Sequence, residues 1–200
     1  DSGRTGRGTP EHWRDKGVEI GVPEITMCTF SKSFGSIGGF VAGEKEVMDY
    51  VQHHARSLIF SASMAPPQVA SVLAALDIME DEKWRATRMK EITNKMIGGF
   101  RDLGFNVGIT ETPIIPLVIG DDTKTFAFWK AMFDMGVYTN PVISPAVPPN
   151  RALIRTSYMA IHSDEELDRV LEIAGEAGRR TGVIGGDGER TATPTRGEAG

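Results

Sequence analysis

The feature that most constrains this 200-residue chain is an apolar segment that runs directly into a glycine-rich turn. Residues 24–30 (E-I-T-M-C-T-F) are apolar and β-branched, which is typical of a buried strand. The turn that follows carries three glycines, and residues 37–42 then indicate a second strand of a hairpin-like unit. A single lysine, Lys32, lies in this turn between two serines, with Thr29 three residues upstream.

Lys32 and its neighbours have the chemistry to hold a phosphate and offer an amine at one place. Hydroxyls and free backbone N–H groups donate to the anion, and glycines let the main chain approach it closely. A desolvated lysine loses its proton, and the neutral amine forms a Schiff base with an aldehyde. The cofactor that combines an aldehyde with a phosphate is pyridoxal phosphate (PLP), whose enzymes anchor it on a lysine. Composition alone favours a plain surface lysine in a polar turn, so longer motifs must decide between the two.

Composition indicates a water-soluble protein. The net charge of −5 and pI near 5.4 give no support to a nucleic-acid partner or an anionic membrane surface. No apolar run approaches the roughly 20 residues that cross a bilayer, and the N-terminal segment lacks a secretory h-region. One cysteine, Cys28, suits a reducing compartment, and no second ligand stands at metal-binding spacing from His12. We expect a cytoplasmic protein with no metal.

Four segments, in order, resemble the α-oxoamine synthases, a branch of the fold-type I PLP-dependent enzymes. They are G-R-T-G-R-G-T-P-E-H (3–12), T-F-S-K-S-F-G-S-I-G-G-F-V-A-G (29–43), F-S-A-S-M-A-P-P (60–67) and A-L-I-R-T-S-Y-M-A-I-H-S (152–163). The branch contains serine palmitoyltransferase, aminooxononanoate synthase, 2-amino-3-ketobutyrate CoA ligase and aminolevulinate synthase. The sequence reads most like serine palmitoyltransferase.

The resemblance implies an α/β fold and a chain that corresponds to the C-terminal half of a longer family member. Residues 1–95 would be the C-terminal part of the PLP-binding large domain, and residues 96–180 a small α+β C-terminal domain. Residues 181–200 are rich in Gly, Thr, Arg and Glu, and we expect a disordered tail there.

Periodicity predicts alternating helices and strands along the rest of the chain. The expected helices are 11–16, 44–56, 65–82, 83–103, 121–135 and 163–178, the last with the capping box S-D-E-E. The expected strands are 113–120, 137–139 and 152–158, and Pro116 makes the first of them an edge strand or a bulged one.

Four residues are the candidate site. The resemblance implies that Lys32 binds PLP and acts as the catalytic base, that Thr29 binds the phosphate, and that Ser61 reaches the phosphate of the other subunit. Ser63 is then the expected N-cap of the helix that follows. The structural alternative is that the hydroxyls of this segment serve only to cap that helix. Arg155 falls in an otherwise apolar strand, where an unpaired guanidinium is costly, so it needs a partner. A substrate carboxylate fits its planar fork, and the resemblance assigns it that role; an internal Asp or Glu is the structural alternative.

The implied function is a PLP-dependent acyl-CoA:amino acid C-acyltransferase that condenses an amino acid with an acyl-CoA and releases carbon dioxide. The implied assembly is a homodimer with a shared active site. Aminooxononanoate synthase and 2-amino-3-ketobutyrate CoA ligase are the near alternatives, and the amino acid and acyl chain stay open. Two other classes also remain: a non-catalytic folding or dimerisation module, and an ordinary class I/II aminotransferase that would use Lys32 and Arg155 too.

Overall fold

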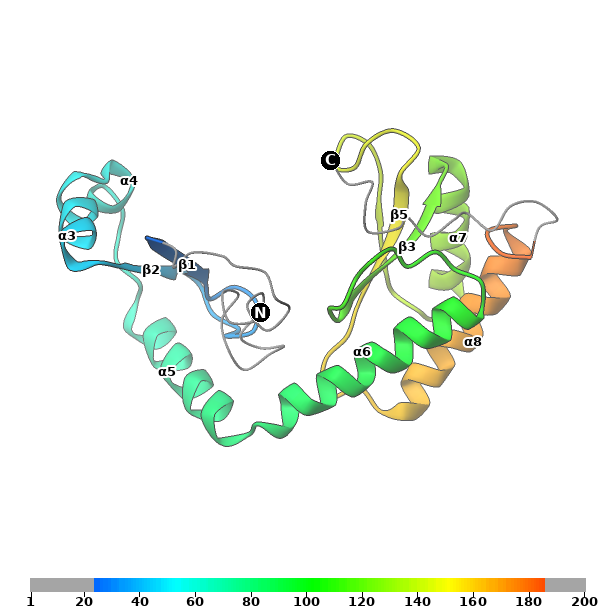
Figure 1. Ribbon diagram of the computed structural model, residues 1–200, viewed down its shortest axis with the longest axis horizontal. Coiled ribbons are helices and arrows are strands. Elements are labelled where there is room, and N and C mark those ends of the chain that lie inside the picture. The colour runs from blue at the N-terminus through cyan, green and yellow to red at the C-terminus, as the bar shows by residue number, and fades with distance from the viewer. Residues whose placement is uncertain (1–23, 186–200) are drawn as a thin grey trace. The chain divides into compact units, whose positions relative to one another are not determined.

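A computed structural model describes residues 24–185 of the chain (Figure 1). The chain divides into two compact units between Ala86 and Thr87, and each unit is described by itself. This division falls near the start of helix α6 (Trp84–Asp102) rather than near residue 95. The reason is that Ile92 and Met96 of α6 are fully buried in the core of the second unit. The G-R-T-G-R-G segment and the helix expected at 11–16 lie outside the described residues.

The first unit is a two-stranded antiparallel hairpin followed by helices. Strand β1 (Ile25–Thr29) pairs with β2 (Gly39–Gly43), from Ile25 opposite Gly43 to Thr29 opposite Gly39. The helices are α3 (Lys45–His54), α4 (Arg56–Ile59) and α5 (Pro66–Asp81). The predicted hairpin around the lysine turn is therefore confirmed. The predicted burial of its first strand is wrong for this part of the chain, because every residue of β1 is exposed except the half-buried Cys28.

Helix α5 begins differently from the prediction. Its N-cap is Ala65, which makes no side-chain capping bond, and Pro66 and Pro67 open the helix. Proline lacks the N–H that a cap would satisfy and has a backbone angle already suited to the first turn. The expectation that Ser63 caps this helix is wrong.

The second unit is a three-stranded antiparallel sheet packed against three helices. The strand order is β3–β5–β4, with β3 (Ile114–Gly120), β5 (Ala152–Ser157) and β4 (Asn140–Val142). The helices are α6, α7 (Asp122–Asp134) and α8 (Asp164–Arg180) (Figure 1). Strand β3 lies at the edge and its register shifts between Val118 and Gly120, as the internal proline predicted. Strand β4 begins after the predicted 137–139, not within it.

Alternation along the strands directs one set of side chains into the core. Ile115 and Leu117 of β3 are fully buried, as is Ile154 of β5, and they meet apolar residues from all three helices. The largest of these helical residues are Phe100, Phe128, Ile92, Met96, Met132 and Leu167. Within residues 24–185, none of the helices combines the length and the apolar content needed to traverse a bilayer.

Helix α8 confirms its predicted capping box and extends the ordered chain beyond the expected end. The Ser163 side chain accepts from the Glu166 backbone N–H, and the Glu166 carboxylate accepts from the Ser163 N–H at 2.8 Å. After the helix, the Val183 N–H donates to the Gly178 carbonyl at 2.9 Å, and Ile184 is only 8% exposed. The prediction therefore places the start of the unstructured tail too early at Thr181, because Ile184 packs into the core.

Asp164, at the start of α8, joins this helix to α6 through two cations. Its Oδ1 lies 3.1 Å from Arg88 Nη2 and 3.3 Å from Lys95 Nζ. Hydrogen bonds from Arg88 and then Lys95 lower the pKa of Asp164 from its ordinary value of 3.8. The stabilisation is thus fully present above pH 3.8 and is lost as the pH falls through the lower pKa of the folded state.

We expect Asp164→Asn to lower the urea midpoint of the second unit modestly at pH 7, because the ion pairs are exposed. The difference from the unsubstituted chain should shrink as the pH falls below 3.8. Asp134→Asn, which removes an isolated exposed pair with Lys130, is the matched control and should have a smaller effect. If Asp164→Asn lowered the urea midpoint by the same amount at pH 7 and in acid, the charge of Asp164 would not be the cause of the lower stability.

Candidate active site

The lysine turn is held at its base by backbone hydrogen bonds and aromatic packing. The Phe30 N–H donates to the Gly38 carbonyl at 2.9 Å, and the Ser36 N–H donates to the Phe30 carbonyl at 2.9 Å. The Phe30 ring is buried and lies edge-on to Phe34, with ring centroids 5.2 Å apart. These contacts hold the two ends of the loop together, so the backbone on either side of Lys32 is fixed by hydrogen bonds and packing.

Two glycines in this turn have steric reasons to be glycine. Gly38 has a φ of 94°, and a Cβ there would lie 2.6 Å from the Met64 sulfur. A Cβ on Gly39 would overlap the Cys28 carbonyl oxygen. The Ser36 hydroxyl also donates to the Gln68 carbonyl at 3.1 Å, which ties the loop to α5. The backbone is therefore tightly packed at Gly38 and Gly39.

Hydroxyls and the lysine amine form one connected cluster at the end of β1. The Thr29 and Ser31 hydroxyl oxygens are 3.0 Å apart, and Lys32 Nζ donates to Ser31 Oγ at 3.4 Å. The Thr29 hydroxyl also donates to the Gly38 carbonyl at 3.3 Å. The structure thus brings together Lys32 and Thr29, the two predicted residues of this turn. Ser31 links them. The motif placed Ser31 beside Lys32 as one of the hydroxyls that could hold an anion, but it did not predict this link to Thr29.

The Lys32 side chain is exposed in this chain. Among the described residues, Ser31 is the hydrogen-bonding partner of its amine. Its exposure also leaves the nitrogen accessible to a ligand from outside the turn.

Ser61, the predicted phosphate ligand from the other subunit, follows the short helix α4. It is exposed, and its hydroxyl donates back to the Ser57 carbonyl oxygen. Ser61 does not cap α5, so the structural alternative for this pair of serines has no support in the geometry.

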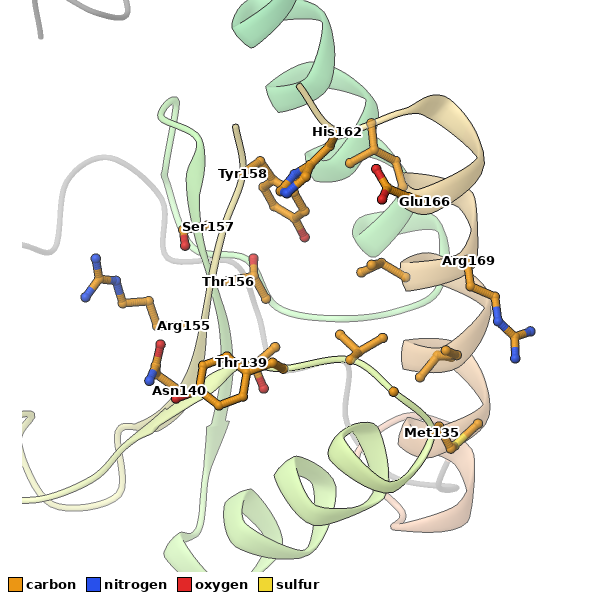
Figure 2. Close-up of a pocket in the computed structure, with 16 residues that line it drawn as sticks. Met135, Thr139, Asn140, Arg155, Thr156, Ser157, Tyr158, His162, Glu166 and Arg169 are labelled. Carbon is orange, nitrogen blue, oxygen red and sulfur yellow. The ribbon is translucent and has the colours of Figure 1, made fainter. Parts of the chain in front are cut away.

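Arg155 belongs to the second unit, in the central strand β5. It lies opposite Pro116 of β3 and Asn140 of β4, and its neighbours Ile154 and Thr156 are buried on the other face. Figure 2 shows its guanidinium on the side of β5 away from α8. Among residues 24–185 no carboxylate forms an ion pair with it. The internal Asp or Glu partner considered above is not found in this part of the chain, and the fork faces outward.

A pocket of about 470 Å³ lies against β5, and its lining includes Arg155 as well as Thr156 and Tyr158 (Figure 2). No pattern in the sequence predicted it. Two hydroxyls in its lining, on Thr139 and Tyr158, are buried and have no hydrogen-bond partner among the described residues. Tyr158 lies within the fourth motif, yet nothing in its spacing distinguishes it from a core aromatic.

The order of elements along the chain is that of the fold-type I PLP-dependent class. A strand leads into a lysine turn with linked hydroxyls, and a long helix later leads to a small antiparallel sheet that presents an arginine. The chain belongs to the aminotransferase class I and II family, which it matches over residues 5–173.

Relatives of known name agree with the resemblance read from the motifs. The chain is 46% identical over 175 residues to serine palmitoyltransferase of Bacteriovorax stolpii, covering 88% of this chain and 41% of that protein. It is 32% identical over 182 residues to 8-amino-7-oxononanoate synthase of Treponema denticola, covering 91% and 45%. These names confirm the α-oxoamine synthase resemblance. The chain spans less than half the length of these relatives.

The fold comparison gives the same result. A solved structure of serine palmitoyltransferase with a PLP internal aldimine matches with a TM-score of 0.77 at 30% identity. That match covers 80% of this chain and 41% of the solved one. The predicted fold class, part of a fold-type I large domain followed by a small α+β domain, is confirmed.

Proposed function

We propose that this chain is part of a PLP-dependent acyl-CoA:amino acid C-acyltransferase of the serine palmitoyltransferase kind. The observation that carries the proposal is the connected cluster of Lys32, Ser31 and Thr29 on a glycine-closed turn. The identity to proteins named serine palmitoyltransferase, 46% in one case, favours this member over 8-amino-7-oxononanoate synthase, at 32%.

The residues present fit a phosphorylated aldehyde. The turn offers one accessible amine, adjacent hydroxyl donors and open space beside the main chain at Gly35. Lys32 would hold PLP through Nζ, and Thr29, with Ser61 of a second subunit, would hold the phosphate. When bound, PLP supplies an electron sink that stabilises negative charge at the α-carbon of an amino acid.

The chain's own side chains would then bind the substrate and move its proton. Arg155 would donate two parallel hydrogen bonds to the amino acid carboxylate, which the open face of β5 leaves room for. Lys32, with its amine free, would accept the α-proton at Nζ. The overall reaction converts an amino acid and an acyl-CoA into an amino ketone, carbon dioxide and CoA.

The assembly we propose is a cytoplasmic homodimer whose active site is shared, because Ser61 would act on the cofactor of the other subunit. The Ser61 hydroxyl now bonds to its own backbone, at Ser57, and would have to exchange that bond for the phosphate.

Incubation of the longer protein with PLP, labelled serine and palmitoyl-CoA tests the proposal. We expect a labelled amino ketone together with stoichiometric carbon dioxide. A labelled ketone with other amino acids or acyl-CoA chain lengths, and none with serine and palmitoyl-CoA, would retain the reaction class and replace the substrates. Transfer of the amino group to a keto acid without condensation would indicate an aminotransferase. Absence of PLP binding would favour a non-catalytic module.

Arg155→Lys should raise KM for the amino acid by about 10- to 100-fold, since a hydrogen bond to a charged group contributes about 1.5–3 kcal/mol. The lysine ammonium in this variant keeps the positive charge but lacks the planar guanidinium geometry that binds a carboxylate at two points. Steady-state kinetics with varied amino acid would measure the change, and PLP absorbance should be unaltered. Arg151→Lys, in the exposed loop before β5, is the matched control and should leave KM unchanged. Equal KM values for the two variants would remove Arg155 from the carboxylate site.

A further inference from the structure

The sheet of the second unit buries one of its faces in the core and leaves the other accessible. Side chains alternate between the two faces along each strand, so the accessible face is made by the residues that share the parity of Arg155 and its cross-strand neighbours. They are Ile114, Pro116 and Val118 of β3, Leu153, Arg155 and Ser157 of β5, and Asn140 and Val142 of β4. All of them are exposed or half-buried.

Arg155 supplies the charge of this face, and nothing on the face balances it. The other side chains there are apolar apart from those of Asn140 and Ser157, and neither of these two is an acid. The guanidinium also forms no ion pair with a carboxylate elsewhere in residues 24–185. A cation next to uncharged polar side chains is suited to binding an anion.

Asn140 is the polar residue placed closest to Arg155 by the strand register. It lies directly opposite Arg155 in the antiparallel pair of β4 and β5. The Cβ atoms of directly opposite residues in such a pair are about 4.5–5.5 Å apart. Figure 2 shows both side chains on the same side of β5, with the Asn140 amide beside the base of the Arg155 side chain. Pro116, opposite Arg155 on the other neighbouring strand, has no side-chain donor to offer.

The Asn140 amide is free to bind a ligand. Neither Asn140 nor Arg155 has a side-chain hydrogen bond or ion pair within the part of the chain that the structure describes. Both also belong to the lining of the pocket against β5. The two side chains are therefore adjacent, accessible and unpaired.

We propose that Asn140 is a second ligand of the anion that Arg155 binds, and that its Nδ2–H donates to the same carboxylate. The proposal rests on the proposed function for the identity of this anion, the carboxylate of the amino acid substrate. The guanidinium donates two parallel hydrogen bonds to the two carboxylate oxygens, and each oxygen keeps a lone pair that can accept from the amide.

An uncharged amide suits this position better than an acid would. The Asn140 amide donates a hydrogen bond without neutralising Arg155. A carboxylate at the same position would pair with the guanidinium and repel the carboxylate of the substrate. Asn140 thus keeps the cation available and adds a donor to the bound anion.

Binding of L-serine to the PLP-loaded longer protein tests the proposal, with PLP absorbance as the readout and no acyl-CoA present. We expect Asn140→Ala to raise the Kd for L-serine at least about fivefold, since it removes one hydrogen bond to a charged group. Asn140→Asp should raise it at least about 50-fold, because a like charge then faces the substrate.

Ethanolamine separates a carboxylate ligand from a residue that only supports the strand. This amine has a hydrogen in place of the carboxylate of serine, so it should bind Asn140→Ala and the unsubstituted protein with the same Kd. The matched controls are Asn94→Ala and Asn94→Asp, at an exposed asparagine of α6 in the same unit. Both should bind L-serine like the unsubstituted protein.

A titration of the 200-residue chain with sodium acetate tests the anion site without cofactor or turnover. We expect the NMR signals of the Arg155 guanidinium and the Asn140 side-chain amide to shift along one binding curve. Asn140→Ala should weaken this binding at least about fivefold, and Asn140→Asp should remove it. Sodium chloride at the same ionic strength should not reproduce the curve, and the backbone amide spectra report whether each variant is folded.

Two results would overturn the proposal. One is a Kd for L-serine that Asn140→Ala leaves unchanged, or raises equally for ethanolamine. The other is acetate binding at Arg155 that Asn140→Ala does not weaken. Failure of the proposed function would be recognised separately: the longer protein would form no amino ketone, while acetate would still bind at Arg155 and Asn140.

Discussion

Replacement of Lys32 by alanine should abolish the visible absorbance of covalently bound PLP in the longer protein and reduce condensation by at least about 10³-fold. The reason is that one nitrogen would have two roles, as covalent anchor and as proton acceptor. No other lysine belongs to the cluster of Thr29 and Ser31 among the described residues. Absorbance spectra after dialysis, and the rate of ketone formation, measure the two roles separately.

Lys45→Ala is the matched control for Lys32→Ala. Lys45 is an exposed lysine of the same unit that pairs with Asp49 one helical turn away. This variant should keep both the absorbance and the rate. A covalent cofactor band that survives in Lys32→Ala would remove the assignment on which the whole proposed function rests.

Phe128→Ala should cost about 3–5 kcal/mol of the free energy of unfolding of the second unit, as expected for a large core aromatic cut to alanine. Phe128 is 0% exposed on α7, and its ring lies 5.5 Å from that of Phe105, which in turn meets Phe100 edge-on at 5.8 Å. Removing the middle of the helix–sheet interface leaves a cavity that these rings cannot fill without leaving their own packing positions.

Phe133→Ala tests whether burial is the cause. Phe133 is on the same helix but 49% exposed, so its truncation should cost a small fraction of that amount. Urea-dependent amide exchange of β3 and β5 measures both variants within the second unit, without the assumption that the two units unfold together. Equal losses for the two variants would mean that the aromatic core described here does not limit stability.

The elements that sequence predicted well have short-range signals. The capping box at Ser163 and Glu166 and the internal proline of β3 each depend on a few neighbouring residues, and both behave as predicted. Strand β4 had its β-branched signal at 137–139 but pairs at 140–142. Its position follows from the register with β5, in which Asn140 lies opposite Arg155, and such a long-range pairing is not encoded in local propensity.

In the candidate site, too, the short-range features were predicted and the long-range ones were not. The motif around Lys32 identified the turn, and the structure joins Lys32 to Thr29. The linking role of Ser31 was missed because it depends on side-chain distances, which spacing does not give. The pocket was not predicted because its lining comes from three segments that are far apart in the sequence: the loop after α7, strand β5 with the residues after it, and the first half of α8.

Strand β5 presents its odd-numbered Arg155 on one face and its even-numbered neighbours toward the interior on the other. Insertions or deletions within this strand therefore keep each side chain on its own face only when they involve an even number of residues. One residue inserted in the strand ahead of Arg155 would turn the guanidinium into the apolar interior and expel Thr156 and Tyr158. The bulge opposite, between Val118 and Gly120, is where a single extra residue has been absorbed without inverting the sheet.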